Sequence, residues 1–227
     1  MKESVEIQAP ASPRKIFIVE DHAVFREGLA QIIRNEGDLI VCGQAGSVAQ
    51  ALPAISRVEP DLVLVDITLP GKSGLQLIKE VRLVNRKVKL LVVSMHDEAL
   101  YADRVLRAGG DGFIMKQEDP DEIIRAIRDV LGGRIYVSEQ VLAGTPKGPV
   151  NGHSKRKTRP LDQLSDSELE ILELLGQGKS NREISSQLHL SVRAVLDHCV
   201  LIKRKLNLKS NNALIRYAVC WLETGAE

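Results

Sequence analysis

Residues 62–71 read Leu62-Val63-Leu64-Val65-Asp66-Ile67-Thr68-Leu69-Pro70-Gly71, an apolar run that ends in a carboxylate and then a turn. A continuous apolar run of this length is typical of a strand buried on both faces of a parallel sheet. In open α/β folds, ligands bind at the carboxyl ends of such strands. We therefore expect Asp66 to lie at the mouth of a binding site.

Three other apolar runs end in polar side chains in the same way, and these side chains are Glu20 with Asp21, then Ser94, then Lys116. Because the carboxyl ends of parallel strands meet at one edge of a sheet, all of these groups should converge. A carboxylate attacks phosphorus poorly unless a cation offsets the charge of the incoming group, and Mg²⁺ prefers oxygen ligands. The pattern predicts a site for Mg²⁺ and a phosphoryl group.

The first part of the chain alternates between strand-like and helix-like segments. Strands are predicted at 15–20, 39–45, 61–66, 88–94 and 111–116. Amphipathic helices are predicted at 24–35, 47–57, 73–84, 98–108 and 119–131. Five successive strand–helix units predict an α/β fold, a parallel sheet with helices on both faces.

The last part of the chain has only helical periodicity, which makes it an all-α module. Two capping boxes, Ser165 with Glu168 and Ser180 with Glu183, open predicted helices at 166–175 and 181–188. Gly176 is expected to close the first of these helices. Ser191 and Ser210 are expected to cap two more helices that run to about 206 and about 222. The order is that of a helix–turn–helix.

Composition narrows the class of protein. Aromatic residues make up only 3% of the chain, so a base-stacking platform for single strands would have little material. The three cysteines are scattered and odd in number, which indicates neither a disulfide framework nor a zinc site. Residues 1–13 are polar, unlike a signal peptide, and no apolar stretch approaches the roughly 20 residues that span a bilayer. We expect a cytoplasmic protein that does not enter a membrane.

Residues 15–131 resemble the receiver domain of two-component response regulators, from Val19-Glu20-Asp21-His22 through Asp66 to Ser94 and Lys116. The resemblance implies a flavodoxin-like (βα)5 fold in which Asp66 accepts a phosphoryl group from a sensor histidine kinase. It implies that Ser94 and Lys116 bind the phosphoryl oxygens, and that Phe113 is the switch residue, where many members have Tyr. It assigns Mg²⁺ to Glu20 through a water, Asp21, Asp66 and the carbonyl of Thr68.

Residues 161–224 resemble the four-helix LuxR-type helix–turn–helix domain of NarL/FixJ-like regulators, chiefly through Gly178-Lys179-Ser180-Asn181-Arg182-Glu183-Ile184 and Leu190-Ser191. The resemblance implies that the helix beginning near Ser191 enters the major groove of double-stranded DNA. The candidate DNA-binding residues are Arg182, Arg193, Leu196, Asp197, Val200, Lys203, Lys205 and Lys209.

This module departs from a typical DNA binder in two respects. Ala194 replaces the usual Thr, and the base-facing positions carry Leu196, Asp197 and Val200, none of which neutralises phosphate. In residues 161–227 nine acidic residues outnumber eight basic ones, which is unfavourable for phosphate contacts. Two interpretations follow. One is a transcription regulator in which phosphorylation controls homodimerisation and DNA binding. The other is a phosphorylation-gated protein-interaction switch that binds DNA weakly or not at all.

An enzyme in the usual sense is not expected, apart from the receiver's own phosphoryl transfer and dephosphorylation. A phosphatase of the haloacid dehalogenase type is disfavoured because Thr68 stands where its second acid would be. The predicted division is a disordered tail at 1–14, a receiver at 15–132, a basic linker at 133–160 and the helix–turn–helix domain at 161–227. In the last helix, Leu214, Ala218 and Trp221 form an apolar stripe for core packing or for dimer contact.

Overall fold

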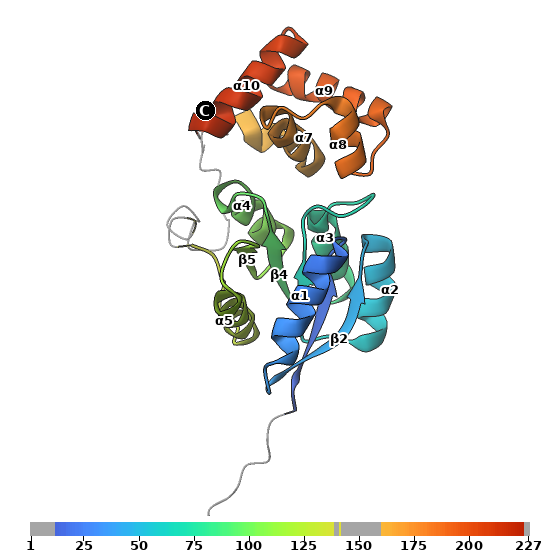
Figure 1. Cartoon of the computed structure of the whole chain (residues 1–227), viewed down its shortest axis with the longest axis vertical. Coiled ribbons are helices and arrows are strands. Elements are labelled where there is room, and N and C mark those ends of the chain that lie inside the picture. Colours follow the sequence, from blue (N-terminus) through green and yellow to red (C-terminus); the bar gives the residue numbers. More distant parts are fainter. Residues whose placement is uncertain (1–11, 139–140, 142–159, 225–227) are drawn as a thin grey trace, which may run out of the picture.

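A computed structural model describes residues 12–138, 141 and 160–224, which form two packed parts (Figure 1). The predicted tail at 1–14 and linker at 133–160 lie mostly outside these residues. The N-terminal part is built on one sheet, in which all strands are parallel and the order is β2-β1-β3-β4-β5. The strands are β1 (Arg14–Val19), β2 (Leu39–Ala45), β3 (Leu62–Val65), β4 (Lys89–Ser94) and β5 (Gly112–Met115).

Helices cover both faces of this sheet, which confirms the predicted α/β fold of the receiver type. They are α1 (Ala23–Arg34), α2 (Val48–Val58), α3 (Gly74–Val84), α4 (Glu98–Ala108) and α5 (Pro120–Leu131). Each follows the strand of the same number, so every connection is a β-α-β crossover of the kind that parallel strands require. Glycine ends α4, where Gly109 has a φ of 99°.

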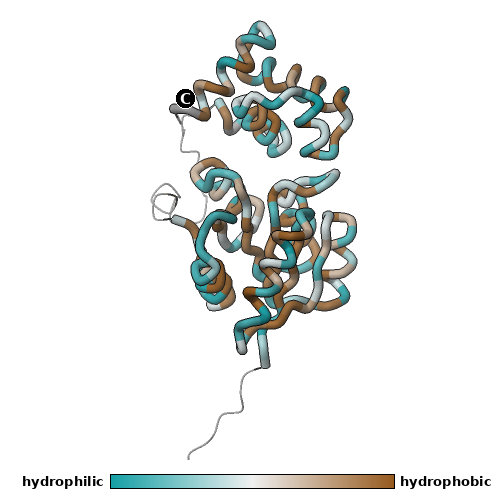
Figure 2. Tube along the Cα trace, in the orientation of Figure 1, coloured by the Kyte–Doolittle hydropathy of each residue, from teal (hydrophilic) through white to brown (hydrophobic). Residues whose placement is uncertain are grey.

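Alternate residues of each strand point to opposite faces of the sheet and so divide the hydrophobic core in two. Residues Val63 and Val65 of β3 pack with α2, α3 and α4, whereas Leu62 and Leu64 pack with α1 and α5. Figure 2 shows the apolar stretches concentrated in the strands and on the inner sides of the helices. A strand buried on both faces must be apolar throughout, which explains the unbroken run that precedes Asp66.

The C-terminal part is helical throughout its described residues, as predicted. It consists of a short 3₁₀ helix η1 (Pro160–Gln163) followed by α7 (Asp166–Gly176), α8 (Asn181–Gln187), α9 (Val192–Lys205) and α10 (Asn211–Thr224). Both predicted capping boxes form, at Ser165 with Glu168 and at Ser180 with Glu183. Ser191 and Ser210 also accept hydrogen bonds from the backbone of the helices that they precede.

Two predictions for these helices are settled by packing. Helix α7 ends at Gly176, one residue later than predicted, and the glycine of positive φ at which the chain turns is Gly178, where φ is 80°. A Cβ at Gly176 would lie 2.6 Å from the Ala218 carbonyl oxygen, so this glycine allows α7 and α10 to approach closely. The stripe of Leu214, Ala218 and Trp221 is buried in the core of the module and is therefore not a dimer surface.

The two parts share one cluster of buried apolar residues that continues from the α2–α4 side of the sheet into the helical module. Arg104 on α4 extends this contact by donating hydrogen bonds to the carbonyl oxygens of Leu161 at 2.7 Å and Leu164 at 2.9 Å. Asp166 at the start of α7 pairs with Lys79 on α3 at 3.1 Å and with Arg104 at 3.3 Å. Among the described residues, no helix has both the length and the apolar character needed to cross a membrane.

The glycine that opens α3 is expected to be essential for the position of the strand end above it. A Cβ at Gly74 would lie 1.9 Å from the Asp66 carbonyl oxygen, so Gly74→Ala should destabilise the protein by about 2 kcal/mol, as overpacking commonly does. Gly28→Ala on α1 is the matched control, because open space surrounds Gly28 and the change should stabilise by about 0.5–1 kcal/mol. Urea unfolding followed by circular dichroism measures both changes. Equal stability of the two variants would contradict the steric argument.

Candidate functional site

The predicted site residues meet at the carboxyl edge of the sheet. Backbone hydrogen bonds extend beyond the strands and hold them there: the Asp66 N–H donates to the Val19 carbonyl at 2.9 Å, and the Lys116 N–H donates to the Ser94 carbonyl at 2.8 Å. The Glu20 N–H reaches the Ala45 carbonyl at 3.0 Å. The main chain therefore fixes each side chain before any ligand is bound.

Lys116 is the cation at the centre of this edge. Its Nζ lies 2.6 Å from Glu20 Oε2 and 2.8 Å from Asp66 Oδ2, and all three side chains are almost fully buried. The ammonium group also lies 4.7 Å from the centre of the Phe25 ring, a cation–π contact from α1. One lysine thus draws together two carboxylates from separate strands.

The electrostatics of the site follow from this crowding. Burial raises the pKa of Asp66, and the Lys116 charge opposes that rise. Burial, followed by the charge of Asp66, likewise raises the pKa of Glu20. For Lys116, burial favours the neutral amine, but the two carboxylates outweigh it and raise its pKa. The lysine alone does not satisfy this group of acids, and a divalent cation would relieve their repulsion.

The acidic cluster fits a hard metal ion. Ligand atoms of Glu20, Asp21, His22 and Asp66 all lie within 4.8 Å of one another. Asp21 Oδ1 is buried and accepts no hydrogen bond from a described residue, although His22 Nδ1 lies 2.9 Å away. A buried carboxylate oxygen without a donor is suited to bind a cation. His22 directly follows Asp21 in the chain but was not among the predicted ligands.

Ser94 and Phe113 are also placed at this edge. Ser94 is fully buried, and its Oγ accepts a hydrogen bond from the His96 N–H at 3.3 Å. The Phe113 ring is buried on the α2–α4 side of the sheet, 1% exposed. The side chain of Thr68 does not point to solvent, because its Oγ1 lies 2.8 Å from His96 Nε2. The functions of these residues remain predictions.

The predicted DNA-binding residues lie mainly on one exposed face of α9. Leu196, Asp197 and Val200 are exposed there, and Arg193 pairs with Asp197 at 3.3 Å. Two of the predicted contacts, Lys203 and Lys205, also bond within the module, because Lys203 donates to Asn211 on the surface and Lys205 to Glu168, each at 2.6 Å. The exposed Arg204, which the sequence analysis did not select, lies one turn beyond Val200.

Comparisons with known proteins agree with this architecture. The model of the response regulator receiver domain matches residues 16–128, and that of the bacterial regulatory proteins of the luxR family matches residues 162–218. The oxygen regulatory protein NreC of Staphylococcus carnosus (strain TM300) is 34% identical over 209 residues, which cover 90% of this chain and 96% of that protein. The chain belongs to the LuxR-type response regulators.

Solved structures show the same fold. A LuxR-family two-component response regulator from Aurantimonas sp. SI85-9A1 superposes with a TM-score of 0.55 at 30% identity, covering 58% of this chain and 94% of that one. The RcsB response regulator of Salmonella typhimurium gives a TM-score of 0.66 at 20% identity, over 92% of this chain and 98% of that one. The family consists of regulators that join a receiver to a DNA-binding domain, not of classical enzymes.

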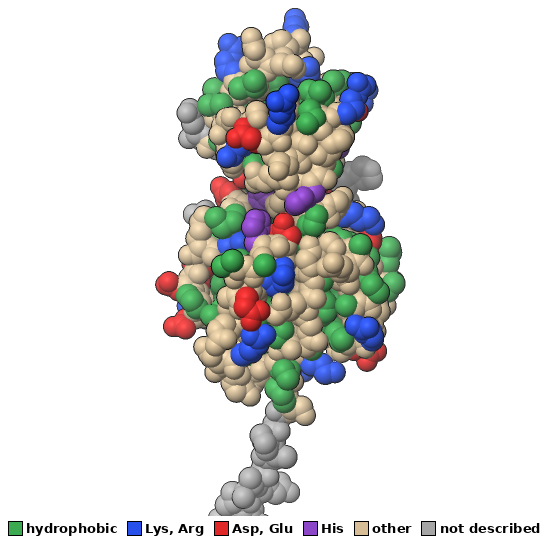
Figure 3. Space-filling model, turned by 45° about the vertical axis from the view of Figure 1, so that its right-hand side comes forward, with side chains coloured by type: hydrophobic (Ala, Val, Ile, Leu, Met, Phe, Trp, Pro, Cys, Tyr) green, Lys and Arg blue, Asp and Glu red, His purple; other side chains and the backbone are tan. Residues whose placement is uncertain are grey.

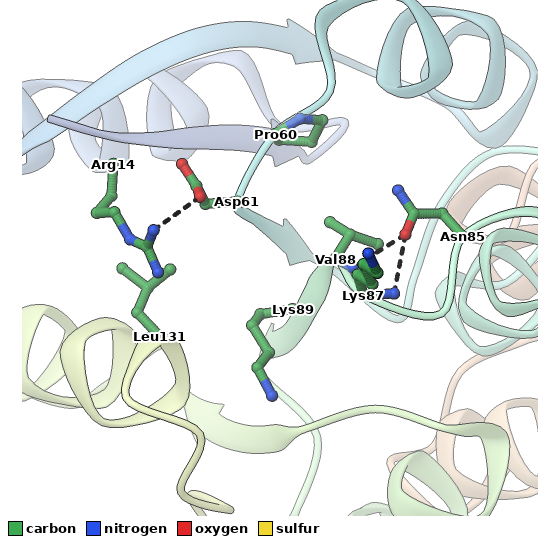
Figure 4. A pocket seen from close by; sticks show the side chains of 8 residues that line it. All are labelled: Arg14, Pro60, Asp61, Asn85, Lys87, Val88, Lys89 and Leu131. Atoms are coloured by element: carbon green, nitrogen blue, oxygen red, sulfur yellow. Dashed lines mark hydrogen bonds and ion pairs between the residues drawn. The ribbon is translucent and has the colours of Figure 1, made fainter. Parts of the chain in front are cut away.

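A cavity of about 190 Å³ in this response regulator lies at the opposite edge of the sheet from Asp66 (Figure 4). It opens where β1, β3 and β4 begin, between residues that include Arg14, Asp61 and Lys89. Arg14 pairs with Asp61 at 3.1 Å, and Lys89 with Asp111 at 3.2 Å. Two of its cations, Arg14 and Lys89, are thus paired, and none of the residues that line the cavity belongs to the acidic cluster around Asp66.

The receiver meets the output module at a buried carboxyl group. Glu170 on α7 is only 5% exposed, and its Oε1 has no hydrogen-bond partner among the described residues. Burial raises the pKa of Glu170 to about 8. The charged groups that act on it are Asp166 and Glu173 of α7, and His96 and Asp66 of the receiver. The packing of α7 against the receiver, called docking below, therefore favours the protonated form of the Glu170 carboxyl group.

Docking should weaken as pH rises. Undocking exposes Glu170 and returns its pKa toward 4.5, so docking takes up a proton between about pH 5 and pH 8. The stabilisation of docking by protonated Glu170 is fully present below that window. As pH rises toward 8, the equilibrium constant for docking falls by up to about tenfold per pH unit. Burial lowers the pKa of His96, but its contact with Glu173 outweighs burial and raises this pKa. Docking therefore also takes up a proton at His96, and this further weakens docking as pH rises.

Small-angle X-ray scattering at pH 6 and pH 8 measures the fraction of extended molecules. This fraction should grow with pH in the natural protein and should grow much less in Glu170→Gln, which keeps the shape but cannot ionise. His96 would account for the residual change. An unaltered pH dependence in Glu170→Gln would show that this carboxyl group does not control docking.

Proposed function

We propose that Asp66 of this response regulator accepts a phosphoryl group from the phosphohistidine of a sensor kinase. A carboxylate oxygen of Asp66 forms the new P–O bond while the P–N bond of the donor breaks, and the donor imidazole leaves. The observation that supports this most directly is the buried ion-pair arrangement at the strand ends, where Lys116 Nζ lies 2.8 Å from Asp66 Oδ2. The Lys116 ammonium group would then pair with the phosphoryl oxygens and stabilise the negative charge that builds up on them during the transfer.

Asp21, Asp66 and the Thr68 carbonyl would hold a Mg²⁺ ion, with Glu20 contributing through a water. The ion would supply charge neutralisation for the phosphoryl oxygens. Asp21 Oδ1 is buried and, apart from the ion-pair contact with His22, has no hydrogen-bond partner among the described residues, which favours this assignment. Glu20 is already bound to Lys116 at 2.6 Å, which suits an indirect role. No other catalytic function of this chain is proposed.

Phosphorylation would change the receiver through Ser94 and Phe113. Ser94 would donate a hydrogen bond to a phosphoryl oxygen, drawing the β4–α4 loop toward Asp66. The space left by that movement would admit the Phe113 ring, which lies buried on the same side of the sheet. A shape change of α4 and β5 would then favour homodimerisation of two receivers.

The output of this switch would be binding to double-stranded DNA through α9. Its outer face is exposed while α7 packs on the receiver, so DNA could reach Leu196, Asp197 and Val200 in this arrangement. Arg182, Arg193, Arg204 and Lys209 would supply phosphate contacts. The alternative, a protein-interaction switch, is favoured by one specific feature: the centre of this face is apolar and acidic rather than basic.

The predicted limits of the two domains can be refined from the contacts that residues near those limits make. Support for extending the receiver from 132 to Ser138 comes from Tyr136, which bridges Gly112 in parallel, and from the Ser138 N–H, which donates to Glu98 at 2.6 Å. The output module would begin at Pro160 with η1, because Leu161 is already buried in the shared apolar cluster.

The phosphoryl site can be tested with acetyl phosphate as donor. The protein should form an acid-stable, hydroxylamine-labile phosphoprotein only in the presence of Mg²⁺, as measured on Phos-tag gels. Asp66→Asn should reduce this to background because the nucleophilic oxygen is lost. Asp103→Asn is the matched control, since Asp103 lies on the surface of α4 and pairs there with Arg107. Phosphorylation of Asp66→Asn at the natural rate would refute the assignment.

DNA binding can be tested by titrating labelled genomic duplexes at two salt concentrations, with and without beryllofluoride and Mg²⁺. Binding should strengthen with the phosphoryl mimic and weaken with salt. Arg193→Ala should lower affinity and reduce the slope of log affinity against log salt by about one, as expected for one lost phosphate contact. Arg216→Ala on α10 serves as the control. A mimic-dependent change in molecular size without any DNA binding would instead support the protein-interaction switch.

A further inference from the structure

The outer face of α9 has an apolar centre. Leu196 is 41% exposed and Val200, one turn later, is 58% exposed. The opposite face of the helix packs into the core of the output module through three buried residues, Val195, Cys199 and Ile202. The two exposed side chains therefore lie outside that core, and their apolar surface is left for a partner outside the module.

Cations lie at both ends of this apolar centre. Figure 3 shows hydrophobic and cationic side chains next to one another over the output module. Arg193 precedes Leu196 by about one turn, and the exposed Arg204 follows Val200 by another, so the two arginines lie on the apolar face about 16 Å apart along the helix axis. The major groove is a floor of base edges about 12 Å wide between two phosphate backbones. This match of charge and length favours double-stranded DNA over an apolar protein surface as the partner.

The chemistry of the apolar centre limits which bases it can recognise. Leu196 and Val200 have no hydrogen-bonding side-chain group, and the apolar group that base pairs offer in the major groove is the C5-methyl group of thymine. Asp197 lies next to Leu196 with 60% of its side chain exposed, and a carboxylate there is repelled by phosphate. It can instead accept a hydrogen bond from a base amino group, such as N4 of cytosine. The centre of this face is therefore suited to base edges and unsuited to the phosphate backbone.

We propose that α9 recognises thymine, with Leu196 and Val200 packed against the C5-methyl groups of two thymines in the major groove. Arg193 and Arg204 contact the phosphates on either side of these bases. The inference rests on the DNA binding proposed above and adds the base that is read. The helix advances about 6 Å from Leu196 to Val200, and successive base pairs are about 3.4 Å apart, so the two thymines lie about two base steps from each other.

Two contributions to affinity for DNA can be separated on this basis. Each methyl contact should raise affinity by about fourfold, the effect expected from burying one apolar carbon group, so loss of both contacts should lower affinity by about tenfold or more. The phosphate contacts should contribute equally whatever the base, and they should weaken with salt. Removal of methyl groups from the DNA therefore tests base recognition while the protein and the phosphates stay the same.

The probes are duplexes that the full-length protein selects from a genomic library, with and without beryllofluoride and Mg²⁺. Each selected duplex is synthesised in two forms, one with thymine and one with uracil, which pairs in the same way and lacks only the methyl group. Fluorescence anisotropy at one salt concentration measures affinity. The natural protein should bind the uracil form about tenfold or more weakly. Leu196→Ala/Val200→Ala should bind the thymine form about as weakly as the natural protein binds the uracil form, and should not distinguish the two forms.

Arg193→Ala is the matched control, because it removes a phosphate contact and should weaken binding of both forms alike while the preference for thymine stays. The double variant should keep its helix, since both positions are exposed and alanine favours helix, and circular dichroism checks this. Equal affinity of the natural protein for the two forms would overturn the inference, and so would a double variant that still prefers thymine. Absence of binding to any duplex would refute the proposed DNA binding, and this inference with it.

Discussion

The structure depends on the burial of like charges at the edge of a parallel sheet. Glu20 and Asp66 are delivered there by strands that cannot move, because backbone hydrogen bonds and a core on both faces fix them. Lys116 bridges the two carboxylates but leaves Asp21 with a buried oxygen that accepts no hydrogen bond from a described residue. A site that is held together while its charges remain incompletely balanced is prepared to take up a cation and a phosphoryl group.

The same constraint extends into the output module. Helix α7 places Glu170 and Glu173 above an edge that is already acidic, where burial favours the protonated form of Glu170 and Glu173 pairs with His96. Apolar burial and the Asp166 ion pairs hold the parts together.

The exposed face of α9 stands apart from this interface. Leu196 and Val200 on this face are exposed while α7 packs on the receiver. The basic residues of the module serve partly as structural groups. Lys205 holds the capping box of α7 through Glu168, and Lys203 ties α9 to the start of α10. The surface charge that is left for DNA is correspondingly small.

Local sequence was sufficient for the elements of this fold and for most of the residues gathered around Asp66, although not for His22. Apolar runs, strand-end acids and serine caps act over a few residues, and parallel strands bring their ends together by rule. Sequence could not show that Gly176 is needed for the close approach of α10 to the end of α7. Nor could it show the partners of Lys205, His96 and Glu173, because each pair is far apart in the chain. Only tertiary packing decides which side chains share a dry interface, and there an ordinary surface glutamate such as Glu170 becomes a buried acid.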